Sequence, residues 1–268
     1  MKSTLTRKHA LLLLLFSGCA LLLFFSFKKK SQPDNPQIAA PEKLEVPILT
    51  QSRPEQVIEH IGYTVSYNPD WCIPNWVAYE LTDAESEGTE ARAKHFVPDP
   101  DVKGFCPSSK DYSNSGYDRG HMAPAGDMKW SEQAMRESFY LSNICPQNHN
   151  LNSGDWKSLE EKVRGWSKEF QNVYITCGPV VSAHSATIGA CNITVPDAFF
   201  KVVLCQNNGQ WQSIGFYFEN KAGHKPLNTY CKTVDEIEEL TGIDFFPMLE
   251  DSIENVIEAT YSTSFWGL

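Results

Sequence analysis

The sequence is short of positive charge. Its 23 Lys and Arg stand against 33 Asp and Glu, which gives a formal net charge of −10 at pH 7. Six of the 23 lie within residues 1–30, where there is no acid, so residues 31–268 carry 17 basic and 33 acidic side chains, a net charge of −16. A protein that coats nucleic acid neutralises many phosphates through a dense Lys/Arg surface. The composition argues against a coat protein, but it allows an enzyme that holds a few phosphates in a small basic site.

The sequence also lacks any C-x-x-C pair, the spacing typical of structural zinc sites. Beyond Cys19, the cysteines are scattered along the chain at Cys72, Cys106, Cys145, Cys177, Cys191, Cys205 and Cys231. This scatter predicts a mixture of buried thiols and two or three disulfides in an oxidising compartment, with at least one thiol unpaired. The spacing does not give the connectivity.

Long apolar runs are equally scarce, and the exception is residues 10–27. Basic residues precede the run at Lys2, Arg7 and Lys8, and residues 28–30 are all Lys. Its 18 residues barely suffice to cross a bilayer as a helix, and no A-x-A cleavage site follows. We expect residues 1–30 to be an uncleaved membrane anchor, with the rest of the chain outside the cytoplasm. The alternatives are a cleaved signal, which would give a secreted or periplasmic protein, and lipid attachment at Cys19.

The remaining chain has no internal repeat and only one stretch that reads as a linker. Residues 31–56 are Pro-rich, polar and without periodicity, which is typical of a flexible tether. Residues 57–268 are therefore predicted to form one domain.

Within that domain, strand and helix patterns interleave without a regular βαβ repeat. Strands are predicted at 63–67, 76–81, 173–177, 199–205 and 211–218, and helices at 131–137, 152–170 and 234–240. The strand at 173–177 should end at Gly178-Pro179, Asn207-Asn208-Gly209 should form a turn, and Thr233 with Glu236 should form a capping box. The pattern favours an α+β fold with a mainly antiparallel sheet.

The densest chemical segment runs from Tyr117 to Asp127 and reads YDRGHMAPAGD. It places an acid, a guanidinium and an imidazole in the four residues 118–121, and Pro and Gly then break the chain. A lone tetrapeptide of this kind arises by chance, so the interpretation depends on the residues that follow.

Two further motifs follow at residues 141–147 (LSNICPQ) and 151–156 (LNSGDW). On the helix predicted there, Asn152, Trp156, Glu160 and Arg164 are spaced four residues apart and share one face. Asn152 and Glu160 would be separated by roughly 12 Å along the helix axis. We therefore expect only one of the two to contact a metal ion directly.

Together these motifs resemble the DNA/RNA non-specific endonuclease family, whose mitochondrial branch includes endonuclease G. The family pattern is D-R-G-H, M-x-P, S-N-x-x-P-Q, L-N and W-x-x-L-E with an Arg four residues later, and every element is present in order over roughly residues 60–250. Cys145 and Ser153 depart from the residues common in the family, at positions that do not carry its chemistry. The resemblance implies a ββα-metal nuclease fold, with mainly antiparallel sheets flanked by helices.

The resemblance also implies separate catalytic roles for a general base and a metal ion. His121 matches the general base that deprotonates the attacking water. Asn152 matches the sole direct protein ligand of a hydrated Mg²⁺, for which Mn²⁺ is a candidate substitute. Histidine meets the requirement for a base near neutral pH, and Mg²⁺ prefers oxygen ligands and keeps several waters.

The other matching residues are polar or charged groups around that centre. Arg119 and Arg164 match contacts to the substrate phosphate and the transition state. Glu160 matches an acid that acts through water or neighbouring groups, and Asn143 matches a polar organiser of the site. The expected substrates are DNA and RNA, and the expected products carry 5′-phosphate and 3′-hydroxyl ends.

Two other functions stay open at this stage. One is an inactive, nuclease-like module that binds nucleic acid, and the other is a phosphodiesterase for smaller substrates. The presence of both His121 and Asn152 favours the nuclease. A homodimer, a protein inhibitor and the biological role are also left open.

Overall fold

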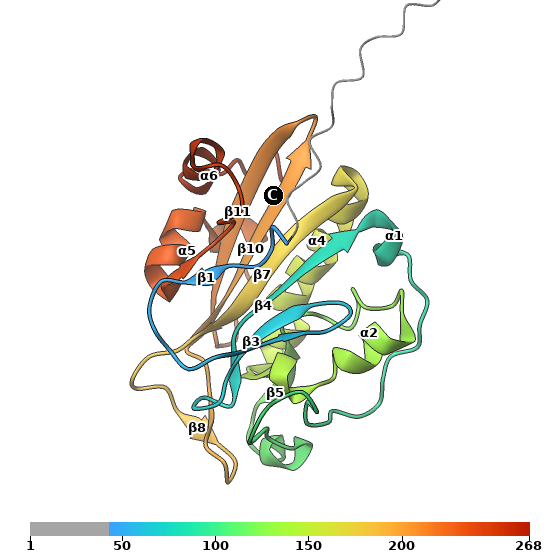
Figure 1. Ribbon diagram of the computed structural model, residues 1–268, viewed down its shortest axis with the longest axis vertical. Coiled ribbons are helices and arrows are strands. Elements are labelled where there is room, and N and C mark those ends of the chain that lie inside the picture. The colour runs from blue at the N-terminus through green and yellow to red at the C-terminus, as the bar shows by residue number, and fades with distance from the viewer. Residues whose placement is uncertain (1–42) are drawn as a thin grey trace, which may run out of the picture. The chain divides into compact units, whose positions relative to one another are not determined.

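A seven-stranded antiparallel sheet forms the centre of this computed structural model, which describes residues 43–268 (Figure 1). The strand order is β12-β11-β10-β7-β4-β3-β2, and each neighbouring pair is antiparallel. The strands are β1 Ile48–Leu49, β2 Gln56–Glu59, β3 Thr64–Asn68, β4 Ile73–Thr82, β5 Asp118–His121, β6 Ile144–Gln147, β7 Asn172–Val180, β8 Thr187–Ile188, β9 Ile193–Thr194, β10 Ala198–Asn207, β11 Gln210–Glu219, β12 Cys231–Lys232 and β13 Ile243–Asp244. The α-helices are α1 Asp83–Ser86, α2 Glu132–Glu137, α3 His149–Ser153, α4 Asp155–Phe170, α5 Val234–Thr241 and α6 Asp251–Glu258, and short 3-10 helices cover Ser109–Tyr112, Leu141–Asn143 and Leu227–Tyr230.

The central hairpin shows how local sequence sets the register of this sheet. β10 and β11 pair along their full length, and Asn207 lies opposite Gln210. The two residues between the strands, Asn208 and Gly209, have φ angles of 51° and 80°. Left-handed conformations at both positions match the twist of the strands, and Asn-Gly adopts them readily. The predicted turn is confirmed.

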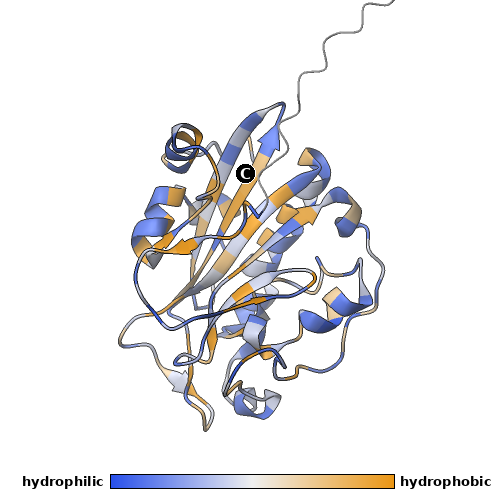
Figure 2. Cartoon of the chain, viewed as in Figure 1, coloured by the Kyte–Doolittle hydropathy of each residue, from blue (hydrophilic) through white to orange (hydrophobic). Residues whose placement is uncertain are grey.

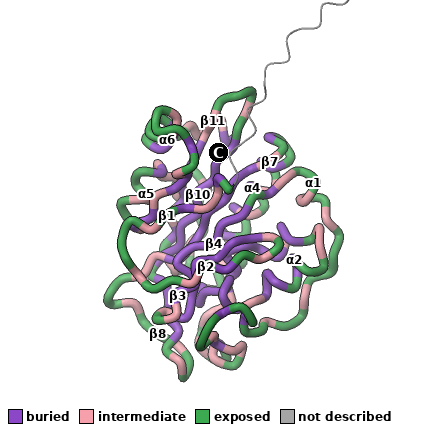
Figure 3. Tube along the Cα trace, in the orientation of Figure 1, coloured by how far each residue is buried: buried purple, intermediate pink, exposed green. Residues whose placement is uncertain are grey.

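The sheet buries both of its faces, and this separates the interior into two cores. Because side chains alternate along β10, Phe199 and Val203 belong to one core and Phe200 and Val202 to the other. Helix α4 packs into the first core through residues such as Trp156, whereas α5 and α6 pack into the second. The strands are accordingly apolar and buried, while the outer faces of the helices are polar and exposed (Figures 2 and 3).

Outside the large sheet, β5 and β6 form a separate antiparallel pair, and the chain continues from β6 into α3 and α4. Two paired strands followed by a helix give the ββα arrangement. The predicted α+β class with a mainly antiparallel sheet and flanking helices is confirmed.

The helix predicted over 152–170 is the main correction to the expected elements. It is broken at Gly154, which has φ −110° and ψ −108° and separates α3 from α4. A Cβ at this position would lie 2.4 Å from the backbone oxygen of Asn150, so the sharp bend requires glycine. Asn152 therefore lies on α3 and not on one helix face with Glu160. β7 also continues through Gly178-Pro179 to Val180, because β10 pairs with it along that length.

The other predicted strands and helices are present within a few residues, including the capping box of Thr233 and Glu236 at the start of α5. The strands and α-helices that the sequence patterns missed are α6 and a set of short elements of two to five residues: β1, β2, β5, β6, β8, β9, β12, β13, α1 and α3. Elements this short carry too little periodicity to be recognised, and the eight residues of α6 pack only through one narrow apolar stripe.

The ordered domain begins earlier than residue 57. Leu44 is fully buried, and β1 pairs with β13, so residues 43–56 belong to the folded unit and not to a tether. The predicted anchor at 10–27 lies outside the described residues. Within residues 43–268, no helix has both the length and the apolar character that a bilayer crossing demands.

All seven cysteines of the described residues are free thiols, which contradicts the expectation of two or three disulfides. Cys145, Cys177 and Cys205 are individually buried in the core. There they pack as small apolar side chains, a role that free cysteine commonly has.

Candidate active site

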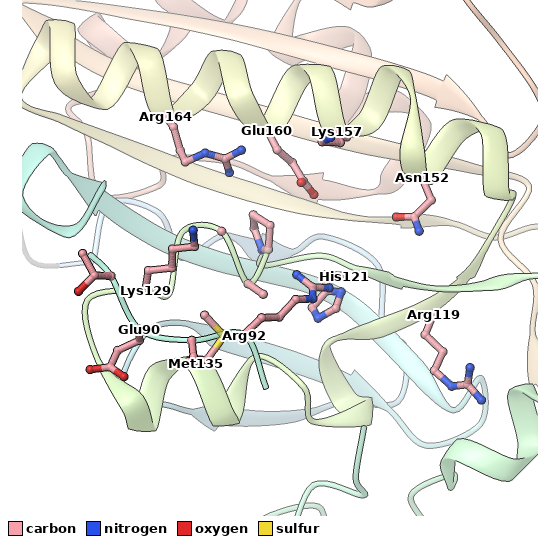
Figure 4. Close-up of a pocket in the computed structure, with 15 residues that line it drawn as sticks. Glu90, Arg92, Arg119, His121, Lys129, Met135, Asn152, Lys157, Glu160 and Arg164 are labelled. Atoms are coloured by element: carbon pink, nitrogen blue, oxygen red, sulfur yellow. The ribbon is translucent and has the colours of Figure 1, made fainter. Parts of the chain in front are cut away.

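A cationic cleft lies between α4 and the segment that follows β5 (Figure 4). It has a volume of about 630 Å³, and its walls include the basic residues Arg92, Arg119, Lys129, Lys157 and Arg164. Only two acidic residues, Glu90 and Glu160, line it. The cleft is thus locally basic in a chain whose overall charge is negative, and five of the six residues predicted from the sequence reach it; Asn143 does not.

His121 ends β5 and points into this cleft. Its ring lies between two aromatic rings, with centroids 5.3 Å from Phe96 and 4.8 Å from Phe139. Nε2 is buried without a hydrogen-bond partner, so Nδ1 is the ring nitrogen through which His121 can reach the cleft. The preceding Gly120 lets β5 pack closely against Gln147 of β6, because a Cβ at residue 120 would lie 2.2 Å from the side-chain oxygen of Gln147.

Burial in this aromatic setting and, to a smaller extent, the positive charge of Arg92 together lower the pKa of His121 to about 3. Low-polarity surroundings and a neighbouring cation both disfavour the imidazolium form. His121 is therefore uncharged at neutral pH, with a lone pair available to accept a proton.

This low pKa predicts a pH-dependent stability. Because the pKa of His121 is about 3 in the fold against 6.5 ordinarily, the unfolded chain binds more protons between these values. The free energy of unfolding should fall as the pH drops below 6.5, by roughly 2.7 kcal/mol at pH 4.5. Urea unfolding in EDTA at pH 7.5 and 4.5 should show this loss in the wild type and a smaller loss in His121→Phe. Equal losses in both proteins would contradict the assignment.

Asn143 holds the segment after His121 in place. Its Oδ1 accepts a hydrogen bond from the Ala123 backbone N–H at 2.9 Å, and its Nδ2 donates to the carbonyls of Ala123 and Ser138 at 2.9 and 2.8 Å. The side chain is fully buried and lies outside the cleft. These contacts fit the predicted organising role and leave Asn143 no contact with substrate.

Asn152 reaches the cleft from α3, opposite His121 (Figure 4). Its Nδ2 donates to Asp118 Oδ2 at 2.9 Å, and the same carboxylate oxygen lies 2.9 Å from His149 Nδ1. The bond to Asp118 fixes the amide, and Oδ1 makes no hydrogen bond within residues 43–268. An oriented, unused amide oxygen beside a carboxylate is a donor set that suits Mg²⁺.

Arg164 reaches the same cleft from the middle of α4. Its Nη1 donates to Asp127 Oδ1 at 2.6 Å, and the fully buried Asp127 also accepts from the Tyr79 hydroxyl at 2.9 Å. Gly126 leaves room for the guanidinium, because a Cβ there would lie 2.8 Å from Nη1. The remaining N–H groups of Arg164 are free to bind an anion in the cleft.

Glu160 lies one helical turn before Arg164 and points into the cleft (Figure 4). Burial raises the pKa of Glu160 to about 7, while Lys201 lowers it and Asp127 raises it. Lys201 is fully buried, has no hydrogen-bond partner, and holds Nζ 4.7 Å from the centre of the Trp156 ring. The Glu160 carboxyl can therefore gain or lose a proton near neutral pH.

Arg119 lies at the far end of the cleft and points away from His121 (Figure 4). Its Nη2 donates to the Ser109 carbonyl at 2.5 Å, and its guanidinium lies 5.7 Å and 5.6 Å from the rings of Phe96 and Tyr112. Arg119 thus supports the Phe96 wall against which His121 packs. A phosphate contact by Arg119 stays a prediction.

The site also contains charged residues that sequence reasoning did not single out, among them Asp118, Asp127, Arg92, Lys129, Lys157 and Lys201. The two acids lie inside the recognised motif and could have been found there, because a cleft Asn or Arg needs a partner that orients its side chain. The basic residues come from other segments of the chain. His60 lies outside the cleft, and its Nε2 lies 3.0 Å from Asp99 Oδ2.

Comparison with known proteins gives a consistent result. Residues 41–252 match the family model described as DNA/RNA non-specific endonuclease. The chain is 36% identical over 211 residues to a Xenopus laevis protein named "Nuclease EXOG, mitochondrial", a match that covers 72% of this chain and 58% of the relative. The mouse protein of the same name is 33% identical over 263 residues, covering 88% and 70% of the two chains. The match to the Xenopus relative thus spans less than two thirds of that protein.

A solved structure shares the fold. A chain in the structure titled "Crystal structure of the EndoG/EndoGI complex: Mechanism of EndoG inhibition" superposes with a TM-score of 0.70 and 29% identity. The match covers 74% of this chain and 89% of that one. It includes enough of both chains to support the same overall architecture.

Proposed function

The chain belongs to the DNA/RNA non-specific endonuclease family, and from this we propose that it hydrolyses internal phosphodiester bonds of DNA and RNA. One observation carries the proposal: an uncharged His121 and the free amide oxygen of Asn152 face the same cationic cleft from two different elements. A base, a candidate metal anchor and phosphate-binding cations together suit phosphodiester hydrolysis.

In the proposed reaction, cationic side chains hold one phosphate of the backbone. Arg164, already oriented by Asp127, would donate two hydrogen bonds to its oxygens. The other cations of the cleft would offset the charge that develops on the phosphorus centre. Contacts limited to phosphate carry no base information, which agrees with cleavage of both DNA and RNA.

His121 would act as the general base. Nδ1 would take a proton from a water molecule as the water oxygen bonds to phosphorus and the bond to the 3′-oxygen breaks. The products would carry a 5′-phosphate and, once the 3′-oxygen is protonated, a 3′-hydroxyl. The bound phosphodiester, being negative, would counter the effect of Arg92 and raise the pKa of His121 towards the range of an effective base.

Asn152 Oδ1 would hold the metal ion, with Asp118 fixing the direction of the amide. A bound Mg²⁺, or Mn²⁺ in its place, would supply positive charge where the leaving oxygen becomes negative. Glu160 would orient water in the cleft and hold a proton near neutral pH, as its raised pKa of about 7 allows.

Asp118→Ala tests the orienting contact. Loss of the carboxylate leaves the Asn152 amide free to rotate. We therefore expect the apparent affinity for Mg²⁺, or the activity, to fall by about 10–100-fold. His149→Ala is the matched control, because it removes the other partner of Asp118 from an exposed position. Its Mg²⁺ titration should stay close to wild type. An unchanged titration in Asp118→Ala would show that Asn152 needs no such support.

The direct test of the function is digestion by the full chain. Supercoiled DNA, single-stranded DNA and RNA should all be degraded with Mg²⁺ and left intact in EDTA. Binding without cleavage would support the inactive module instead. Cleavage limited to small diesters such as bis-p-nitrophenyl phosphate would support the phosphodiesterase.

We also propose that the domain is located on the side of a membrane that faces away from the cytosol. The basic and apolar character of residues 1–30 supports this, and two relatives are named as mitochondrial nucleases. Fractionation should recover the full chain in the membrane fraction or in the compartment beyond that membrane. Recovery of the full chain in the cytosolic fraction would overturn the proposal.

A further inference from the structure

Three carboxylates meet where α5 and α6 pack together, on the sheet face opposite α4 and the cleft (Figure 1). Asp235 and Glu238 are three residues apart on α5 and so share one face of that helix. Glu258 is the last residue of α6. One oxygen from each of the three carboxylates lies within 4.8 Å of the other two.

Glu258 is the unusual member of this cluster. It is only 5% exposed, and its Oε1 is buried without a hydrogen-bond partner. Burial raises the pKa of Glu258 to about 9, and the nearby charges of Glu238, Glu254, Asp235 and Asp244 raise it too. Every one of these neighbours is acidic, and none of the five forms an ion pair within residues 43–268. A buried carboxylate without a partner is costly, so the site calls for a bound cation or proton.

We propose that Asp235, Glu238 and Glu258 form a second divalent-cation site, suited to Ca²⁺, that clamps α6 onto α5. Ca²⁺ binds six to eight oxygens at 2.3–2.6 Å, so two of its ligand oxygens can be separated by up to about 5 Å. The three carboxylate oxygens lie within 4.8 Å of one another, so one such shell can include all three, and Ca²⁺ accepts an irregular set of ligands from two helices more readily than the strictly octahedral Mg²⁺.

The surroundings of the cluster suit an exchangeable ion. Asp235 is exposed, which gives a path from solvent and room for water ligands. Glu238 is oriented by the Phe245 backbone N–H, which donates to its Oε1 at 2.8 Å. On the inner side, α6 is tied to the sheet because the Ser213 hydroxyl donates to the Ile257 carbonyl at 2.7 Å. A cation here would join two helices that otherwise meet through like charges.

The test is thermal unfolding of the EDTA-treated full chain during a Ca²⁺ titration. At saturation, Tm should rise by about 3 °C or more, since a ligand that binds only the folded state stabilises it. The rise should persist in Asn152→Ala, which alters the cleft, and in Glu239→Gln, an exposed position on α5. In the Asn152→Ala background, it should vanish when Glu258→Gln is added and weaken when Asp235→Asn is added.

Glu258→Gln should fold, because the amide has nearly the shape of the protonated carboxyl that it replaces, and a measurement of Ca²⁺ stoichiometry by equilibrium dialysis complements the Tm. Asn152→Ala should bind one ion per chain, and the double variant Asn152→Ala/Glu258→Gln should bind none. The same Tm rise in Asn152→Ala/Glu258→Gln as in Asn152→Ala overturns the proposal. So does the absence of any Ca²⁺ effect, which would mean that the cluster holds a proton. Neither result bears on the nuclease assignment, which has its own assay.

Discussion

His121→Ala should lower kcat/KM for both DNA and RNA by about 10²–10⁴-fold while leaving the fold intact. His121 is uncharged at neutral pH and can accept a proton. Within residues 43–268, no other histidine lines the cleft. Removal of a general base leaves the water without a proton acceptor, but the cations that bind phosphate remain. The loss should therefore appear in kcat, with KM little changed.

The matched control for this variant is His184→Ala, since His184 is exposed and lies outside the cleft. It should keep wild-type kinetics. Circular dichroism and Tm at pH 7.5 establish that His121→Ala is folded. Near-normal turnover in a folded His121→Ala would mean that another group, or water alone, accepts the proton.

Asn152→Ala should reduce turnover by about 10²–10⁴-fold and weaken the dependence on Mg²⁺ at the same time. The variant removes the amide oxygen proposed to anchor the ion, and it leaves Asp118 without one of its two donors. The cleavage rate should be measured as a function of Mg²⁺ concentration. This titration separates an increase in the half-saturating Mg²⁺ concentration from a decrease in the limiting rate.

Asn150→Ala serves as the control on the same short helix. Asn150 is exposed and does not line the cleft, so its replacement should change neither the rate nor the Mg²⁺ titration. If Asn152→Ala alters the limiting rate but leaves the Mg²⁺ titration unchanged, the ion is held elsewhere. Asn152 would then be assigned to substrate positioning.

Much of the site could be predicted because its parts are close in sequence or belong to a recognised motif. His121, Asn152, Glu160 and Arg164 all line the cleft. The strands of the central sheet were also predictable, because β4, β7, β10 and β11 are long and strongly apolar. Long elements with a clear pattern leave few alternatives.

The features that were not predicted depend on contacts between segments that are far apart in the sequence, or on local bends that no sequence pattern reveals. The bend at Gly154 moves Asn152 off the α4 axis, and a single glycine in a helical sequence does not by itself reveal such a break. Arg92 and Lys201 act on His121 and Glu160 only because the fold brings β10 and the loop after α1 to the cleft.

The two faces of the sheet carry different kinds of charge. On the α4 face, acids such as Asp127 orient cations that point into the cleft. On the opposite face, Asp235, Glu238 and Glu258 have no such partners within residues 43–268. The excess of acid in the chain is therefore compatible with a small basic cleft, which would hold a substrate through a few phosphate contacts and not through a broad basic surface.

Single-turnover cleavage of one oligonucleotide by His121→Ala, Asn152→Ala and the double variant tests the central claim most directly. If the two residues serve the same chemical step, the double variant should be no slower than the slower single variant, because residues that act as a unit are not additive. Losses that multiply, so that the double variant falls by the product of the two single effects, would contradict a shared base-and-metal centre.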